Sequence, residues 1–117
     1  MRILVLGDVV GEPGRRLMEA HLPSIRREHS VDFVIVNGEN AAHGHGITER
    51  IAQDWFDTLA VDVISTGNHA FDVKDIAQYF QREPRLLRPL NYPPATPGQG
   101  FVKLHTPGGA EVMVVNL

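Results

Sequence analysis

Three short segments place oxygen- and nitrogen-bearing side chains beside a glycine, each directly after an apolar run. The segments are Gly7-Asp8, Asn37-Gly38-Glu39-Asn40 and Ser65-Thr66-Gly67-Asn68-His69. Carboxylate, amide and imidazole groups are ligands for Mg, Mn, Fe and Zn ions. Two such cations close together acidify water and neutralise the charge that develops when a phosphoester is attacked. The segments therefore predict metal-dependent hydrolysis, with the metal ligands Asp8, Glu39, Asn40 and Asn68 and the proton donor His69.

Each of these residues also has a structural explanation when it is considered alone. Asp8 would suit the following helix as a cap, and Glu39-Asn40 would suit an exposed turn. Asn68 tolerates the left-handed backbone conformation. Three successive segments that all carry ligand-type residues beside a glycine are harder to explain in this way, so the metal-site interpretation is preferred.

The elements that must position these segments are strands of a parallel sheet. Continuous apolar runs at residues 2–6, 31–36 and 61–66 predict three buried strands. Helical patterns separate them, and this alternation predicts an α/β fold. Ligands of an open α/β sheet bind at the carboxyl ends of its strands. The three polar segments follow those ends, so the fold should bring them to one rim.

The first predicted helix opens at residues 11–14 (GEPG), where Pro13 fits the first turn. Its inward face is predicted to carry Leu17, His21 or Leu22, and Ile25. Pro23 is expected to kink or divide this helix, because proline removes a backbone donor from the helix interior.

Two further helices are predicted from their caps. One runs over residues 48–59, with Thr48 as its cap and with Trp55 and Phe56 in the core. The other runs over residues 72–81, with Asp72 as its cap. Each follows a polar segment, so these helices should cover the sheet that carries the segments.

The chain after residue 83 is rich in proline, which predicts a stiff loop over residues 88–100. Residues 101–105 and 111–116 are predicted to form two antiparallel strands joined at Pro107-Gly108-Gly109. Arg88 and Asn91 lie in the stiff loop, where contact with a substrate phosphate competes with a purely structural role. His43 and His45, in the glycine-rich loop after Glu39, are two further candidates for phosphate contact.

The composition is that of one ordinary globular domain. The chain has 117 residues, of which 43% are hydrophobic and 21% charged, and its formal net charge of −3 does not suit binding to duplex nucleic acid. It has no cysteine, so thiolate metal sites and disulfides are excluded. No apolar run reaches the roughly 18 residues of a membrane span, and a cytoplasmic protein without membrane partners is expected.

The polar segments and their surroundings resemble one family, the YmdB-like metallophosphoesterases of the calcineurin-like superfamily. The resemblance rests on residues 3–14 (ILVLGDVVGEPG), 32–42 (DFVIVNGENAA), 66–69 (TGNH) with Asp72, and 88–93 (RPLNYP). It implies an αββα sandwich, here in partial form, with parallel strands alternating with helices and followed by a hairpin. It also implies hydrolysis of phosphodiesters such as 2′,3′-cyclic nucleotides with two metal ions, iron or manganese, with magnesium and zinc as alternatives.

By the same resemblance, Asp8, Glu39 and Asn40 hold the first metal, Glu39 bridges to a second metal held by Asn68, and His69 donates a proton. The D-x-H and G-D-x-x-D patterns of the wider superfamily are replaced here by Asp8-Val9-Val10 and Gly38-Glu39-Asn40. Family members resemble this chain over about their first half, and the histidine ligands of their second half have no counterpart in it. We therefore expect residues 1–117 to be the amino-terminal part of a single metallophosphoesterase domain, with weak metal binding and little hydrolysis on their own.

Two other interpretations stay open. In one, a non-catalytic α/β domain keeps the strand-end segments only to bind a nucleotide or a protein. In the other, a homo-oligomer covers the apolar strand at residues 111–116 with a neighbouring chain. Loss of hydrolysis on substitution of His69 would separate an enzyme from a binding module.

Overall fold

Two sheets and three helices form the fold, and the computed structural model describes every residue from Met1 to Leu117. The first sheet is parallel, with the order β1 (Ile3–Leu6), β2 (Phe33–Asn37), β3 (Val63–Ser65) and β4 (Leu86–Leu87). The helices are α1 (Gly11–Glu28), α2 (Glu49–Asp57) and α3 (Ile76–Arg82). The second sheet is an antiparallel hairpin of β5 (Phe101–His105) and β6 (Glu111–Val115). The predicted α/β alternation and the predicted hairpin are both confirmed.

The strand register brings the three polar segments to one edge of the parallel sheet. Leu6 of β1 pairs with Val36 of β2, and Asn37 at the end of β2 pairs with Ser65 at the end of β3. Parallel strands have their carboxyl ends on the same side. The turns that follow β1, β2 and β3 are therefore neighbours in space, as the sequence predicts.

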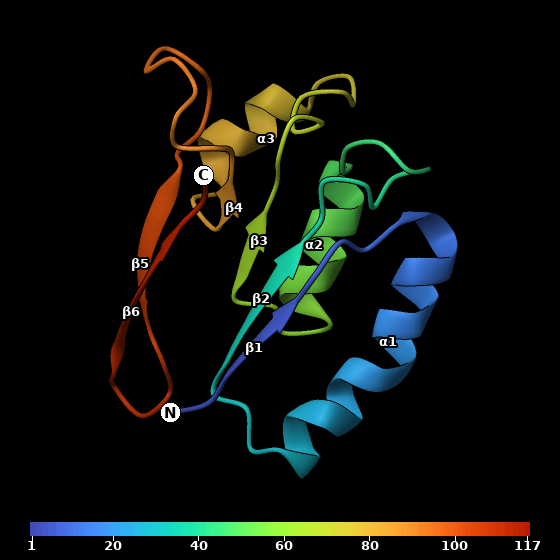
Figure 1. Ribbon diagram of the computed structural model, residues 1–117, viewed down its shortest axis with the longest axis vertical. Coiled ribbons are helices and arrows are strands. Elements are labelled where there is room, and N and C mark those ends of the chain that lie inside the picture. The colour runs from blue at the N-terminus through green and yellow to red at the C-terminus, as the bar shows by residue number, and fades with distance from the viewer.

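The sheet has an apolar layer on each face. Residues such as Val34, Val36 and Ile64 join the larger core, which also contains Trp55 of α2. Their neighbours along the strands, such as Phe33 and Val63, form a smaller core with residues of the hairpin. Figure 1 shows the parallel sheet between α1 and α2 on one side and the hairpin on the other. The helices, the parallel sheet and the hairpin are thus three of the four layers of the expected αββα sandwich.

The outer face of the hairpin carries exposed apolar side chains. Phe101, Met113 and Val115 are 46%, 56% and 44% exposed, and no helix of this chain covers them. The structure therefore has a helical layer on only one side of its two sheets.

Helix α1 differs from the prediction in two ways. It runs unbroken from Gly11 to Glu28 with Pro23 inside it, so Pro23 does not divide the helix, and the kink given as the alternative stays a prediction. Its buried residues include Met18 and Leu22, whereas Leu17 is 65% exposed. Successive helical residues are about 100° apart around the axis. When Met18 faces the core, Leu17 therefore lies outside the buried face of the helix.

The other two helices show where cap prediction succeeds and where it fails. Thr48 caps α2, because its hydroxyl oxygen accepts a hydrogen bond from the Ile51 amide at 3.1 Å. The predicted cap at Asp72 is wrong, since α3 begins only at Ile76 and the carboxylate of Asp72 contacts His69 instead. Trp55 is buried, as predicted. None of the three helices is both long enough and apolar enough to cross a membrane.

Two ionisable side chains with shifted pKa values belong to the supporting structure. Burial raises the pKa of Asp62, whose carboxylate accepts a hydrogen bond from the Val34 amide at 2.7 Å and so ties the start of β3 to β2. Burial also raises the pKa of Tyr79 in α3 to about 12. Asp62 lies just before β3, and Tyr79 lies in α3.

Candidate functional site

Asp8 and Asn40 meet at the ends of β1 and β2. The side-chain amide of Asn40 donates to both carboxylate oxygens of Asp8, at 2.9 and 3.0 Å. Backbone hydrogen bonds from Val9 to Asn37 (3.2 Å) and from Gly11 to Asn40 (2.9 Å) hold the two turns together. Asp8 does not cap α1, whose N-cap is Val10 and has no side-chain hydrogen bond. The alternative explanation of Asp8 as a helix cap is therefore excluded.

Glu39 is held by two neighbouring turns. Its amide donates to Asn37 Oδ1 at 3.1 Å, and its Oε1 accepts from Asn37 Nδ2 at 3.4 Å. The carboxylate lies directly against Gly67, because a Cβ atom added there would stand 2.8 Å from Glu39 Cδ. Its other oxygen, Oε2, is buried and has no hydrogen-bond partner. An unpartnered buried carboxylate oxygen is costly, and a cation would compensate it.

The turn at residues 66–69 is anchored by parts of the chain that are distant in sequence. The Thr66 hydroxyl donates to the Leu87 carbonyl at 2.7 Å, and Asn116 Nδ2 donates to the Thr66 carbonyl at 2.8 Å. The Tyr92 hydroxyl donates to the Gly67 carbonyl at 3.3 Å. Sequence reasoning missed the roles of Tyr92 and Asn116, although an asparagine that ends an apolar strand was a visible feature. These bonds fix the backbone on which Asn68 and His69 stand.

His69 contacts a neighbour through each ring nitrogen. Its Nδ1 lies 2.6 Å from Asp72 Oδ2, and its Nε2 lies 3.4 Å from Asn68 Nδ2. With a proton on Nδ1, the ring donates to Asp72 and its Nε2 faces the amide of Asn68. Asp72 thus orients the imidazole, a role that the cap interpretation of this residue did not include.

The four candidate phosphate contacts have different positions. His45 is brought to the site, with its ring centroid 5.1 Å from that of His69, and His43 is exposed in the same loop. Arg88 is only 6% exposed, donates to the Pro89 carbonyl at 2.8 Å and leaves Nε buried without a partner. Asn91 is exposed on the proline-rich loop. The structure therefore brings His45 to the candidate site and buries Arg88.

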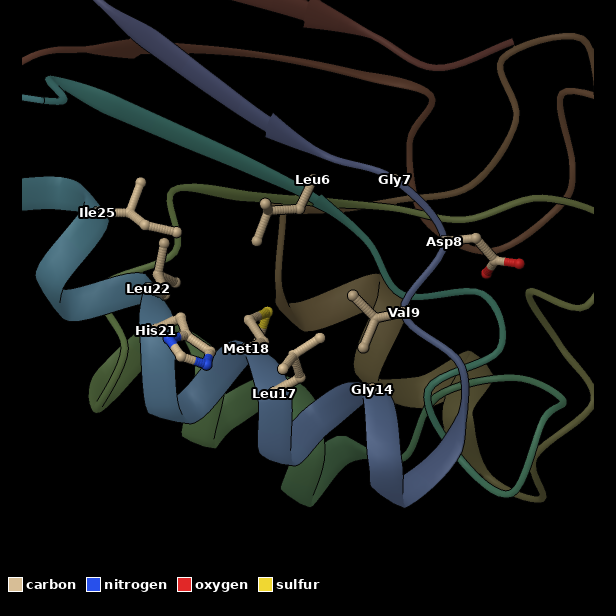
Figure 2. Close-up of a pocket in the computed structure, with 10 residues that line it drawn as sticks. All are labelled: Leu6, Gly7, Asp8, Val9, Gly14, Leu17, Met18, His21, Leu22 and Ile25. Atoms are coloured by element: carbon tan, nitrogen blue, oxygen red, sulfur yellow. The ribbon is translucent and has the colours of Figure 1, made fainter.

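The structure also has an apolar groove beside the candidate site. The groove, of about 550 Å³, lies between β1 and α1 and is lined by Leu6, Val9 and Met18 among others. Figure 2 shows the Asp8 carboxylate pointing away from these apolar side chains. Gly7 and Asp8 belong to the lining of the groove, so the groove directly adjoins the strand-end residues.

The residues at the strand ends fit a divalent metal. The predicted ligands are two carboxylates and two amides, and oxygen donors of this kind suit Mg, Mn and Fe ions. The buried Glu39 Oε2 is a free acceptor within this set. Gly67 leaves the space that the carboxylate fills. The carboxylate and amide groups of Asp8, Glu39, Asn40 and Asn68 are thus chemically suited to hold a metal.

Gly67→Ala tests the fit between Gly67 and Glu39. The added Cβ would displace the Glu39 carboxylate, which is the end of a flexible side chain. Metal affinity should therefore fall by at least about tenfold, while the unfolding temperature stays nearly unchanged. The metal affinity and the unfolding temperature are measured on the longest protein that the gene containing these residues encodes. This protein is called the gene product below.

Gly7→Ala is the matched control, because a Cβ at this strand end would have no neighbour within 4 Å. Equal metal affinity in the two alanine variants would contradict the proposed contact.

Comparison with known proteins identifies one family and a relative of named activity. The family described as YmdB-like protein matches residues 4–117. A Bacillus subtilis (strain 168) protein named 2′,3′-cyclic-nucleotide 2′-phosphodiesterase is 44% identical over 117 residues, which are 100% of this chain and 44% of that protein. The chain thus spans less than half the length of this relative.

Two solved structures have the same fold. A hypothetical protein from Thermus thermophilus is 45% identical, with a TM-score of 0.87 over 98% of this chain and 44% of that one. A novel phosphatase from Mycoplasma pneumoniae is 31% identical, with a TM-score of 0.86 over 98% of this chain and 42% of that one. Both chains are more than twice as long as the part that they share with this structure.

Proposed function

The chain belongs to the YmdB-like protein family, and on that basis we propose that it is part of a metal-dependent phosphodiesterase that hydrolyses 2′,3′-cyclic nucleotides. The observation that carries this proposal is the Glu39 carboxylate, held against Gly67 with Oε2 buried and unpartnered. The name of the Bacillus subtilis relative supports the substrate class. Iron and manganese are the proposed metals, with magnesium and zinc as alternatives.

In this proposal, residues 1–117 are the amino-terminal part of one metallophosphoesterase domain. The support is that relatives share this fold over less than half of their length. Carboxylates and amides alone leave much of the coordination of a second metal to water. The isolated 117 residues should therefore bind metal weakly and hydrolyse little.

The metal ligands would be Asp8, Glu39, Asn40 and Asn68. When bound, the two ions would acidify the attacking water and neutralise charge on the phosphate. Asn40 positions Asp8 by donating to both of its carboxylate oxygens. Asn37 and Gly67 fix the direction of the Glu39 side chain.

His69 would supply the proton that the leaving group needs. As one P–O bond of the cyclic diester breaks, the leaving ribose oxygen takes a proton from Nε2 of the imidazolium. Asp72 accepts from Nδ1 at 2.6 Å, which fixes the orientation of the ring. Nε2, the nitrogen that does not face Asp72, lies 3.4 Å from Asn68 Nδ2.

Removal of metal from the gene product tests the proposed function. Hydrolysis of 2′,3′-cyclic AMP should disappear on chelation and return when Mn²⁺ or Fe²⁺ is added back. The ratio of bound metal to protein is measured at each step, so that loss of activity can be compared with loss of metal. Hydrolysis that continues at full rate in metal-free protein would refute the metal mechanism. Tight binding of the nucleotide without any hydrolysis would favour the non-catalytic binding domain.

A further inference from the structure

His45, His69 and Asp72 form a second cluster of metal-ligating groups. Each offers one ligand atom, and these atoms all lie within 4.8 Å of one another. None of the three belongs to the ligand set Asp8, Glu39, Asn40 and Asn68. Two imidazoles and one carboxylate are a donor set that zinc sites in proteins use, with the fourth position open.

The packing of two loops brings His45 to this cluster. The loop at residues 42–46 is closed by hydrogen bonds from the His45 amide to Ala42 O (2.9 Å) and from the Ala42 amide to Gly46 O (2.8 Å). Gly46 has a φ of +69°, and a Cβ there would stand 2.9 Å from Val73 Cγ2 and 3.2 Å from His69 O. The loop therefore lies directly on the turn that carries His69 and Asp72, at a distance that only glycine allows.

We propose that His45, His69 and Asp72 form an inhibitory site for Zn²⁺. A tetrahedral zinc ion with bonds of roughly 2.0–2.1 Å holds its ligand atoms about 3.4 Å apart. The 2.6 Å contact between His69 Nδ1 and Asp72 Oδ2 must lengthen slightly. The exposed His45 side chain must turn inward, and its ligand atom lies at most 4.8 Å from those of His69 and Asp72. Both adjustments are small rotations of partly or fully exposed side chains.

Zinc at this cluster would remove His69 from catalysis. A metal on either ring nitrogen prevents formation of the imidazolium, which is the form that gives its proton to the leaving oxygen. Imidazole ligands favour Zn²⁺ over Mn²⁺ and Mg²⁺, so the site should distinguish an inhibitory ion from an activating one. This inhibition rests on the proposed function, whereas the binding of zinc does not.

Zinc binding is tested in a gene product in which Asp8→Ala and Glu39→Ala have removed the candidate catalytic ligands. Calorimetric titration with Zn²⁺ should show a site that depends on His45, and the imidazole NMR signals of His45 and His69 should shift together. His45→Ala should weaken the affinity by at least about tenfold. His43→Ala is the matched control, because His43 is an exposed histidine of the same loop that is not in the cluster. Equal zinc affinity in the His45 and His43 variants would overturn the proposal.

Inhibition is tested in the gene product with Asp8 and Glu39 intact. The zinc concentration that halves the rate, measured against each variant's own zinc-free rate, should rise by at least about tenfold in His45→Ala and stay unchanged in His43→Ala. Equal inhibition of both variants would refute the inhibitory role. If zinc binds as expected but no variant hydrolyses the nucleotide, the proposed function fails and the zinc site stands. If hydrolysis is present but zinc does not bind, the zinc site alone fails.

Discussion

His69→Ala should lower kcat for 2′,3′-cyclic AMP by about 10²–10⁴-fold, because the leaving ribose oxygen loses its proton donor. KM should change little, since the proton is transferred only as the P–O bond breaks. The imidazole is already oriented in the structure, with Nδ1 held 2.6 Å from Asp72 Oδ2. The measurement is kcat and KM of the gene product and of the variant, each loaded with the same metal.

A substrate whose leaving group needs no proton separates proton donation from a structural role. Bis-p-nitrophenyl phosphate releases a stable phenolate, so its hydrolysis should fall far less in His69→Ala than that of the cyclic nucleotide. The bound Mn²⁺ should be unchanged, because His69 is outside the ligand set Asp8, Glu39, Asn40 and Asn68. Equal losses with both substrates would show that His69 acts by holding the site together.

Asp8→Ala with Glu39→Ala should lower hydrolysis by at least about 10³-fold, since a metal ion supplies several kcal/mol to the transition state. The metal-free variant should nevertheless be no less stable than the metal-free parent. Glu39 Oε2 is buried without a partner, so its removal relieves a desolvation cost. Rates of hydrolysis check the first expectation. Thermal unfolding with and without Mn²⁺ checks the second, and bound metal should raise the unfolding temperature only of the parent.

Glu12→Ala is the matched control for the loss of an acidic side chain. Glu12 is exposed in the first turn of α1 and pairs with Arg16 at 2.6 Å. A surface pair of this kind contributes little to stability. Hydrolysis and metal-induced stabilisation should both survive in this variant. Their survival in the Asp8, Glu39 double variant would contradict the assigned ligands.

The sequence predicted the strand ends well because each depends on local features. An apolar run followed by glycine and a polar residue predicts a buried strand and the position of its carboxyl end. Parallel pairing then brings these carboxyl ends together. The contact of Asp8 with Asn40 and that of Glu39 with Gly67 follow from this arrangement. Thr48 was correctly predicted as a cap because a cap bond joins residues three apart.

The features that were missed depend on contacts between distant residues. Strand β4 has only two residues, Leu86 and Leu87, which form a strand because they pair with β3. Asp72 has the residue type of a helix cap, but its carboxylate is bound by His69 and the helix begins later. The approach of His45 to His69 depends on Gly46 packing against residues 69–73. Local patterns do not contain this information.

Metal content measured by elemental analysis tests the central claim most directly. The samples are the 117-residue chain and the gene product, each with and without the Asp8→Ala, Glu39→Ala double substitution. We expect about two iron or manganese ions in the gene product, loss of both in its double variant, and fewer such ions in the 117-residue chain. An absence of metal from every sample, or equal metal with and without Asp8 and Glu39, would contradict the claim that these strand ends form a metal site.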